Sequence, residues 1–282
     1  SLRERPPATL AGVDEDEIAS QRLLFRDVRS FAVGHGCAVT WEGSVPDAVS
    51  TTYLPRHELL LNEAAGGEGL DLSMTALAAD DRFDVLQELI DTYRTWISGL
   101  PGSESEPLED EEQSTLRRHM REAREAANRM EAGLQLLRSD DKVRTAFRLT
   151  NRAMAEQRSR QEHHRSGGFG DPASLGGASW RPFQIAFILT NLAGIADAEH
   201  PDRRIADLLW FPTGGGKTEA YLGIIGIAIL LRRLRYRRAA GVSVLMRYTL
   251  RLLTLQQYQR ATGLICALEM QRLAHLPHTA PI

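Results

Sequence analysis

The residues best suited to chemistry are a lysine and a threonine that follow three glycines, in Pro212-Thr213-Gly214-Gly215-Gly216-Lys217-Thr218-Glu219. The glycines let the backbone turn its N–H groups around phosphate oxygens, because no Cβ blocks the dihedral angles that this turn needs. Lys217 adds a positive charge for the same oxygens, and the hydroxyl of Thr218 can ligate Mg²⁺ at the start of a helix. This stretch predicts a site for ATP and Mg²⁺, with Lys217 and Thr218 as its catalytic residues and Thr218 as the metal ligand.

The stretch departs from the general phosphate-loop pattern at one position. Phe211 stands where G-x-x-x-x-G-K-[ST] has its first glycine, so only the narrower P-T-G-x-G-K-T is met. The alternative is a flexible turn that carries an incidental lysine. A Gly-Lys-Thr between a strand-like stretch and a strongly apolar helix favours the phosphate loop.

The segments around the loop predict an α/β fold. Residues 208–211 read as a buried strand that runs into the loop, and 219–234 read as a helix that packs against a parallel sheet. Residues 241–246 then read as the next strand. The order strand, loop, helix and strand is typical of a parallel sheet with helical crossovers.

A second candidate for nucleotide binding lies upstream, in Arg181-Pro182-Phe183-Gln184 at the start of an apolar helix. A glutamine side chain offers one acceptor and two donors, which match the N6 and N7 edge of adenine. We therefore predict that Gln184 reads adenine and that Arg181 lies beside the nucleotide. The alternative is a surface glutamine with a structural role.

Candidate DNA contacts follow the predicted strand 241–246, at the edge of the sheet where ligands of open α/β folds collect. Guanidinium, hydroxyl and amide groups suit DNA phosphates. The candidates are Arg247, Thr249, Arg251, Thr254 and Gln256. A further arginine cluster at 232–238 ends the helix after the loop, where favourable interaction with the helix dipole explains it better than DNA does.

Three regions are predicted along the chain. Residues 1–104 form a mixed α+β region, with a strand around Val39 and a helix over 83–97. Residues 105–170 form an antiparallel helical hairpin and a linker, with a heptad seam over 116–137 and a helix cap at 139–141. Residues 171–282 hold the phosphate loop.

Composition is ordinary for a soluble globular protein, with 43% hydrophobic and 25% charged residues among 282 and a formal net charge of −3. Any DNA contact therefore needs a local basic surface. Cys37 and Cys266 are the two cysteines of the sequence, which indicates a reducing, cytoplasmic location. The longest apolar run, 221–231, is shorter than the roughly 20 residues of a membrane span, so no membrane association is expected.

Taken together, these motifs resemble the first RecA-like domain of superfamily 2 helicases. Arg181 to Gln184 look like its Q-motif, 212–220 like motif I, and Arg251, Leu253 and Gln256 like motif Ia, although Thr249-Leu250-Arg251 stands where Pro-Thr-Arg is usual. Over longer stretches, 31–41, 209–223 and 246–257, the sequence is similar to the helicase-like component A family of DISARM phage-defence systems. The resemblance implies a DNA-dependent ATPase that acts on invading single- or double-stranded DNA with a DISARM partner subunit.

One part of the helicase pattern is missing from these 282 residues. No Asp-Glu-x-x box follows the motif Ia segment, and no second RecA-like domain follows either. We therefore expect a fragment of a longer protein with a partial RecA-like domain, able to bind ATP weakly but not to hydrolyse it. The alternative function is a P-loop ATPase that serves as a switch or scaffold in a complex without unwinding DNA.

Overall fold

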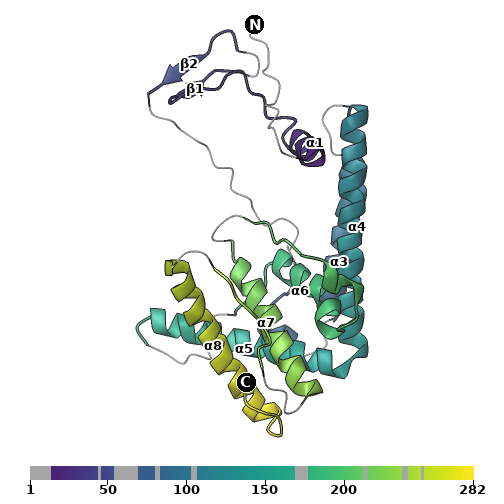
Figure 1. Cartoon of the computed structure of the whole chain (residues 1–282), viewed down its shortest axis with the longest axis vertical. Helices are drawn as coiled ribbons and strands as arrows, with labels where there is room; N and C mark the ends of the chain where they lie inside the picture. Colours follow the sequence, from purple (N-terminus) through teal and green to yellow (C-terminus); the bar gives the residue numbers. More distant parts are fainter. Residues whose placement is uncertain are drawn as a thin grey trace. The chain divides into compact units, whose positions relative to one another are not determined.

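A computed structural model describes most of the chain in two compact units (Figure 1). The first comprises Ser1–Asn62 and Ile97–Ala123, and the second comprises Glu63–Trp96 and Arg124–Ile282. The described residues are 14–43, 46–53, 69–79, 83–102, 107–168, 177–211, 215–236, 241–248 and 251–282. Residues from 124 onward thus belong to the same unit as the described part of the phosphate loop. The three regions expected from the sequence stay a prediction.

The first unit contains a helix and a small sheet. Helix α1 (Glu15–Leu24) is capped by Asp14, whose side chain accepts a hydrogen bond from the backbone N–H of Asp16. Strands β1 (Ala38–Thr40) and β2 (Ser50–Thr52) pair antiparallel, which confirms the strand expected around Val39. Helix α1 is held to the first half of α4 (Asp110–Ser139) by Arg118, which donates to the carbonyl of Asp16 at 2.8 Å.

Helices make up most of the described part of the second unit, and their apolar faces share one core. Helix α3 (Phe83–Gly99) confirms the amphipathic helix expected over 83–97. No helix in the described ranges combines the length and the apolar content that crossing a membrane requires. The remaining elements are α2 (Met74–Ala79), η1 (Leu100–Gly102), α5 (Asp141–Arg165), α6 (Pro182–Ala196), η3 (Pro201–Arg204), α7 (Lys217–Arg235) and α8 (Arg251–His275).

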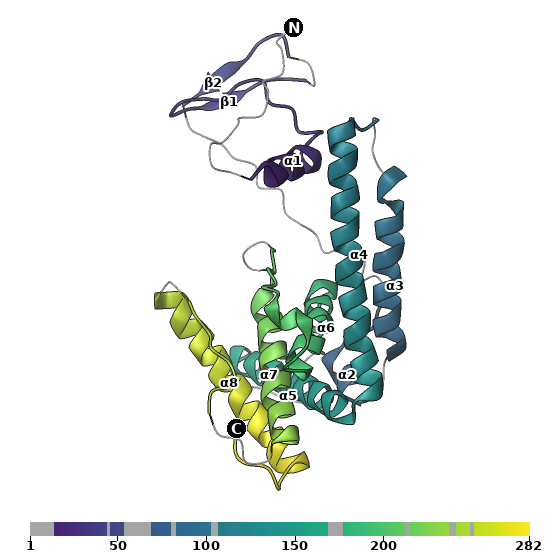
Figure 2. The same ribbon diagram turned by 45° about the vertical axis from the view of Figure 1, so that its right-hand side comes forward.

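The turn between α4 and α5 lies where the sequence predicts it. Asp140 caps α5 by accepting from the backbone N–H groups of Lys142 and Val143, at 2.8 and 3.1 Å. However, α5 does not return along α4 as a hairpin; it crosses to pack against α2, α7 and α8 (Figures 1 and 2). Heptad spacing shows which residues are buried, but it does not identify the helix that covers them.

A small residue allows α5 to approach the helix that follows the phosphate loop. A Cβ added at Gly226 of α7 would lie 2.6 Å from Cγ2 of Thr150 in α5, so a larger side chain would require the side chain of Thr150 or one of the helices to shift. Thr150 is itself buried. Helix α5, expected as part of a separate hairpin, is thus a close neighbour of α7.

The parallel sheet expected around the loop is absent from the residues that the structure describes, where the paired strands are β1 and β2. Burial nevertheless alternates over 207–211, with Leu209 and Phe211 half-buried between the exposed side chains of Leu208 and Trp210. Residues 241–248 are likewise unpaired. Exposed and half-buried side chains alternate over 207–211, as they do in a strand. The partner strands that would complete a sheet are not among the described residues.

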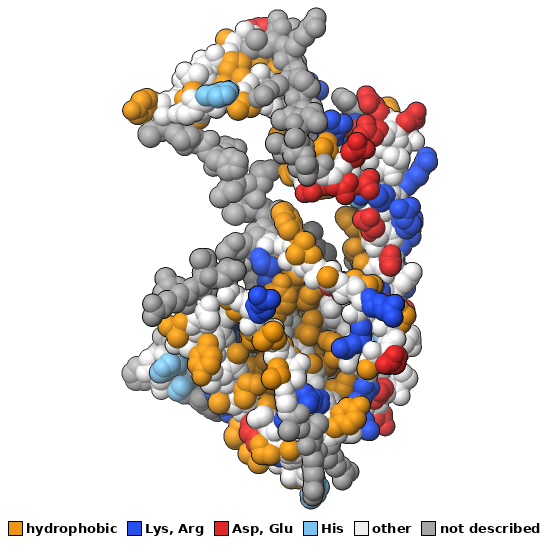
Figure 3. Space-filling view, in the orientation of Figure 1, with side chains coloured by type: hydrophobic (Ala, Val, Ile, Leu, Met, Phe, Trp, Pro, Cys, Tyr) orange, Lys and Arg blue, Asp and Glu red, His pale blue; other side chains and the backbone are white. Residues whose placement is uncertain are grey.

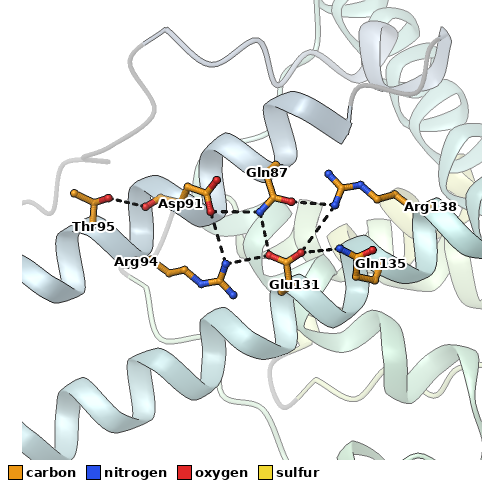
Figure 4. A network of polar contacts seen from close by, with 7 residues as sticks. All are labelled: Gln87, Asp91, Arg94, Thr95, Glu131, Gln135 and Arg138. Carbon is orange, nitrogen blue, oxygen red and sulfur yellow. Dashed lines mark hydrogen bonds and ion pairs between the residues drawn. The ribbon is translucent and has the colours of Figure 1, made fainter.

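Polar side chains join α3 to the second half of α4 (Figure 4). The carboxylate of Glu131 accepts from Gln87 at 3.0 Å, from Arg94 at 3.1 Å and from Gln135 at 2.9 Å. The bond from Gln87 is the main cause of a lowered pKa for Glu131, which burial opposes and the bonds from Gln135 and Arg94 reinforce. This carboxylate therefore contributes to stability in its charged form.

We expect Glu131→Gln to lower the free energy of unfolding by about 1 kcal/mol at neutral pH, because the charged acceptor of three hydrogen bonds is lost. The pKa of Glu131 is lower in the folded than in the unfolded chain, so this contribution is complete above the unfolded pKa. It is lost as the pH falls through the lowered pKa. Urea denaturation at several pH values measures the difference, with the exposed Glu125→Gln on the same helix as control. A difference that grows as the pH falls would contradict the assignment.

Candidate phosphate-loop site

The described part of the phosphate loop ends in a glycine that the geometry requires. Gly216 caps α7 with φ +89° and ψ 23°, a left-handed conformation that other residues rarely adopt. A Cβ at this position would also lie 2.7 Å from Nε2 of Gln184. Pro212, Thr213 and Gly214 lie outside the described residues. Helix α7 begins at Lys217, directly after this glycine, so its first backbone N–H groups lie at this turn.

Arg181 and Gln184, both predicted to lie near the nucleotide, contact the loop directly. Arg181 donates to the carbonyl oxygen of Gly215 at 2.8 Å, and Nε2 of Gln184 donates to that of Gly216 at 2.7 Å. In a planar trans peptide the carbonyl and the following N–H point in opposite directions. These two bonds therefore turn the N–H groups of Gly216 and Lys217 away from α6.

The segment that carries Arg181 and Gln184 is itself held from several sides. The indole N–H of Trp180 donates to Oδ1 of Asn151 in α5 at 2.7 Å, and both residues are buried. The backbone of Trp180 donates to the carbonyl of Leu72 at 3.0 Å. Phe183 stacks on Phe211 with ring centroids 4.2 Å apart. Asn151 was not predicted from the sequence, where the available signal was a polar residue on a largely apolar helix face.

The two predicted catalytic residues and their neighbour lie in the first turn of α7. The ammonium of Lys217 donates to the carbonyl oxygen of Phe211, on the other side of the loop. Thr218 is half-buried. The carboxylate of Glu219 pairs with Arg260 of α8, which ties the start of α7 to a neighbouring helix.

An ion-pair group that the sequence analysis missed anchors the segment leading into the loop. Arg129 of α4 binds both carboxylate oxygens of Asp207, at 2.6 and 2.7 Å, and one oxygen of Asp202 at 2.9 Å. The bond with Asp207 is the main cause of a raised pKa for Arg129, against the effect of burial. Charged residues beside a heptad seam are usually exposed to solvent. The position of Arg129 in the heptad pattern therefore did not distinguish it from the other charged residues of α4.

A pocket of about 370 Å³ lies beside the loop, within the size range of ligand pockets, roughly 300–1,000 Å³. Gln184, Gly216 and Glu219, all predicted for nucleotide binding, line one part of it. Arg158 and Gln161 of α5 line another part. The structure therefore adds α5 to the surroundings of the predicted site.

The predicted DNA contacts are only partly described. Arg247, Thr254 and Gln256 are exposed, whereas Thr249 lies outside the described residues and the side chain of Arg251 is not described. No group of three or more potential metal ligands among His, Cys, Asp and Glu occurs in the described ranges.

The arginine cluster that ends α7 is largely engaged within the chain. Arg232 donates to the carbonyl of Val242 at 2.9 Å, and Arg233 to that of Pro281 at 2.8 Å. Arg235 pairs with Asp140 at 3.2 Å. These bonds support the structural interpretation of the described arginines over a role in DNA binding.

We expect Arg129→Met to lower the free energy of unfolding by about 2 kcal/mol, between the values typical of exposed and buried pairs, since two carboxylates lose their partner. Hydrogen exchange should speed up over 205–211, because this segment loses its anchor on α4. Arg124→Met, an exposed arginine on the same helix, is the matched control. Unchanged exchange over 205–211 in Arg129→Met would show that the ion pairs do not hold this segment.

Comparison with known proteins relates nearly the whole chain to one curated protein. No family model matches the chain. DISARM protein DrmA from Bacillus paralicheniformis is 36% identical to it over 284 residues, which cover 92% of this chain and 25% of that protein. The chain thus spans about a quarter of the length of this relative. The similarity supports a relationship to a DISARM protein that extends over both units of the structure.

Proposed function

We propose that the phosphate loop binds ATP with Mg²⁺ and that it belongs to a DNA-dependent ATPase of the superfamily 2 helicase type. The observation that carries this proposal is the conformation of the loop at the start of α7. Gly216 is left-handed, and the carbonyls of Gly215 and Gly216 are bonded to α6, so the N–H groups of Gly216 and Lys217 are turned the other way. N–H groups at a helix N-terminus favour the negative charge of a phosphate.

Most of the predicted residues have a role in this site. When ATP binds, the ammonium of Lys217 leaves the carbonyl oxygen of Phe211 and donates hydrogen bonds to phosphate oxygens instead. Thr218, in the first turn of α7, supplies a hydroxyl to Mg²⁺, which offsets the charge of the phosphates. Pro212, Thr213 and Gly214 complete the loop, and Arg181 and Gln184 hold its shape. We place the carboxylates that phosphoryl transfer requires in a longer polypeptide.

We further propose that 208–211 and 241–246 are strands of a RecA-like parallel sheet that a longer polypeptide completes. Leu208 and Trp210 are 83% and 78% exposed, and Val242 and Leu245 are 81% and 77% exposed. Figure 3 shows how widely hydrophobic side chains are exposed on this view of the second unit. Val244 and Met246 pack against the core. Apolar residues on both faces of a segment are typical of strands covered by helices on both sides.

The relationship to a DISARM protein gives the proposed ATPase its setting. We propose that it acts on foreign DNA in bacterial phage defence, together with a DISARM partner subunit in the cytoplasm. Arg247, Thr254 and Gln256 are exposed at the end of the proposed second strand and the start of α8, where they can meet DNA phosphates.

We expect Lys217→Ala to weaken the binding of ATP with Mg²⁺ by about tenfold or more, because a charge-assisted hydrogen bond to phosphate is lost. Titration calorimetry of this chain measures the affinity. The sequence contains a second lysine, Lys142, which is exposed near the start of α5, and Lys142→Ala is therefore the matched control. Equal affinities of the two variants would exclude the proposed phosphate contact.

DNA binding has its own test in a polypeptide of the relative's full length. We expect DNA to stimulate ATP hydrolysis, and Arg247→Ala to weaken DNA binding with a smaller dependence on salt, because fewer counterions are released. Arg160→Ala, an exposed arginine on α5, should leave both properties unchanged. ATP hydrolysis that does not respond to DNA would favour the alternative of an ATPase switch or scaffold.

A further inference from the structure

The hydrogen bonds of Gln184 limit what it can offer to a base. Its side-chain oxygen accepts from the backbone N–H of Arg181 at 2.8 Å, and its nitrogen donates to the carbonyl of Gly216 at 2.7 Å. Gln184 is only 3% exposed. One amide hydrogen and one lone pair of the oxygen remain, on a side chain that is almost fully buried, so a second polar group that lines the pocket can share the recognition of the N6 and N7 edge of adenine.

A second amide lines the same pocket from α5. Gln161 is half-buried, and within the described ranges no residue forms a hydrogen bond with its side chain. Met74 and Met154 line the pocket as well, which provides apolar surface. A flat base has apolar faces and a polar edge, and this combination of thioether and amide groups fits both.

Helix α5 is fixed firmly enough to present a residue to this pocket. Nε2 of Gln157, one turn before Gln161, donates to the carbonyl of Arg260 in α8 at 2.8 Å. Asn151 holds Trp180, and Thr150 packs closely on Gly226. Helix α5, which carries Gln161, is thus held by contacts with α8, with the segment before α6 and with α7.

We propose that this pocket receives the adenine of ATP and that Gln161 is a specificity-determining residue. The oxygen of the Gln161 side chain accepts from the N6 amino group, and the remaining amide hydrogen of Gln184 is donated to N7. The base lies on the side of the loop that carries the bonded carbonyls, while the phosphates lie toward the N–H groups of Gly216 and Lys217. This inference rests on the proposed ATP site.

The test compares three ligands, namely ATP, GTP and inorganic triphosphate, each titrated with Mg²⁺ into this chain. We expect the unaltered chain to prefer ATP to GTP, because guanine carries an acceptor where adenine carries N6. Gln161→Ala should weaken ATP binding by about fivefold, as for one neutral hydrogen bond, and should reduce the preference over GTP. Its affinity for triphosphate should not change. Gln259→Ala, an exposed glutamine of α8 outside the pocket, is the matched control.

The possible results separate this inference from the function on which it rests. Unchanged ATP affinity in Gln161→Ala, with binding lost in Lys217→Ala, would overturn the base contact alone. Equal losses for ATP and triphosphate would also overturn it, since the effect would then concern the phosphates or the fold. Failure of the unaltered chain to bind ATP would overturn both proposals. Thermal unfolding of each variant checks that the fold is retained.

Discussion

The arrangement of the site depends on two hydrogen bonds from the start of α6 to the phosphate loop. Arg181 and Gln184 bind the carbonyl oxygens of Gly215 and Gly216, and planar peptides then direct the following N–H groups to the opposite side. A Cβ at Gly216, which is left-handed, would lie 2.7 Å from Nε2 of Gln184, so the bond from Gln184 depends on a glycine at this position. The described end of the loop, Gly215 and Gly216, is therefore held in place by the protein itself, so less conformational freedom of these two residues is lost on binding.

Contacts from distant parts of the chain keep this arrangement in place. Asn151 of α5 holds Trp180, which precedes Arg181, and Arg129 of α4 holds Asp207 in the segment before the loop. Arg260 of α8 pairs with Glu219 just after it. Helices α4, α5 and α8 therefore all contribute contacts that hold the segments around the loop. A nucleotide-binding function for this unit would depend on all of them.

Local rules explain why some elements were predictable and others were not. The cap at Asp140 and the helices on both sides of the loop follow from short-range spacing, and the structure confirms them. The partners of α5 and the ion pairs of Arg129 depend on residues far apart in the sequence, which spacing does not reveal. The parallel sheet remains a prediction, because 208–211 shows the alternation of a strand without a partner among the described residues.

A structure of the protein determined with a non-hydrolysable ATP analogue and Mg²⁺ tests the central claim most directly. The account predicts phosphates at the N–H groups of Gly216 and Lys217 with the metal at Thr218, and the base between Gln184 and α5. Phosphates bound on the side of Arg181 and Gln184, or a nucleotide bound away from this loop, would contradict it.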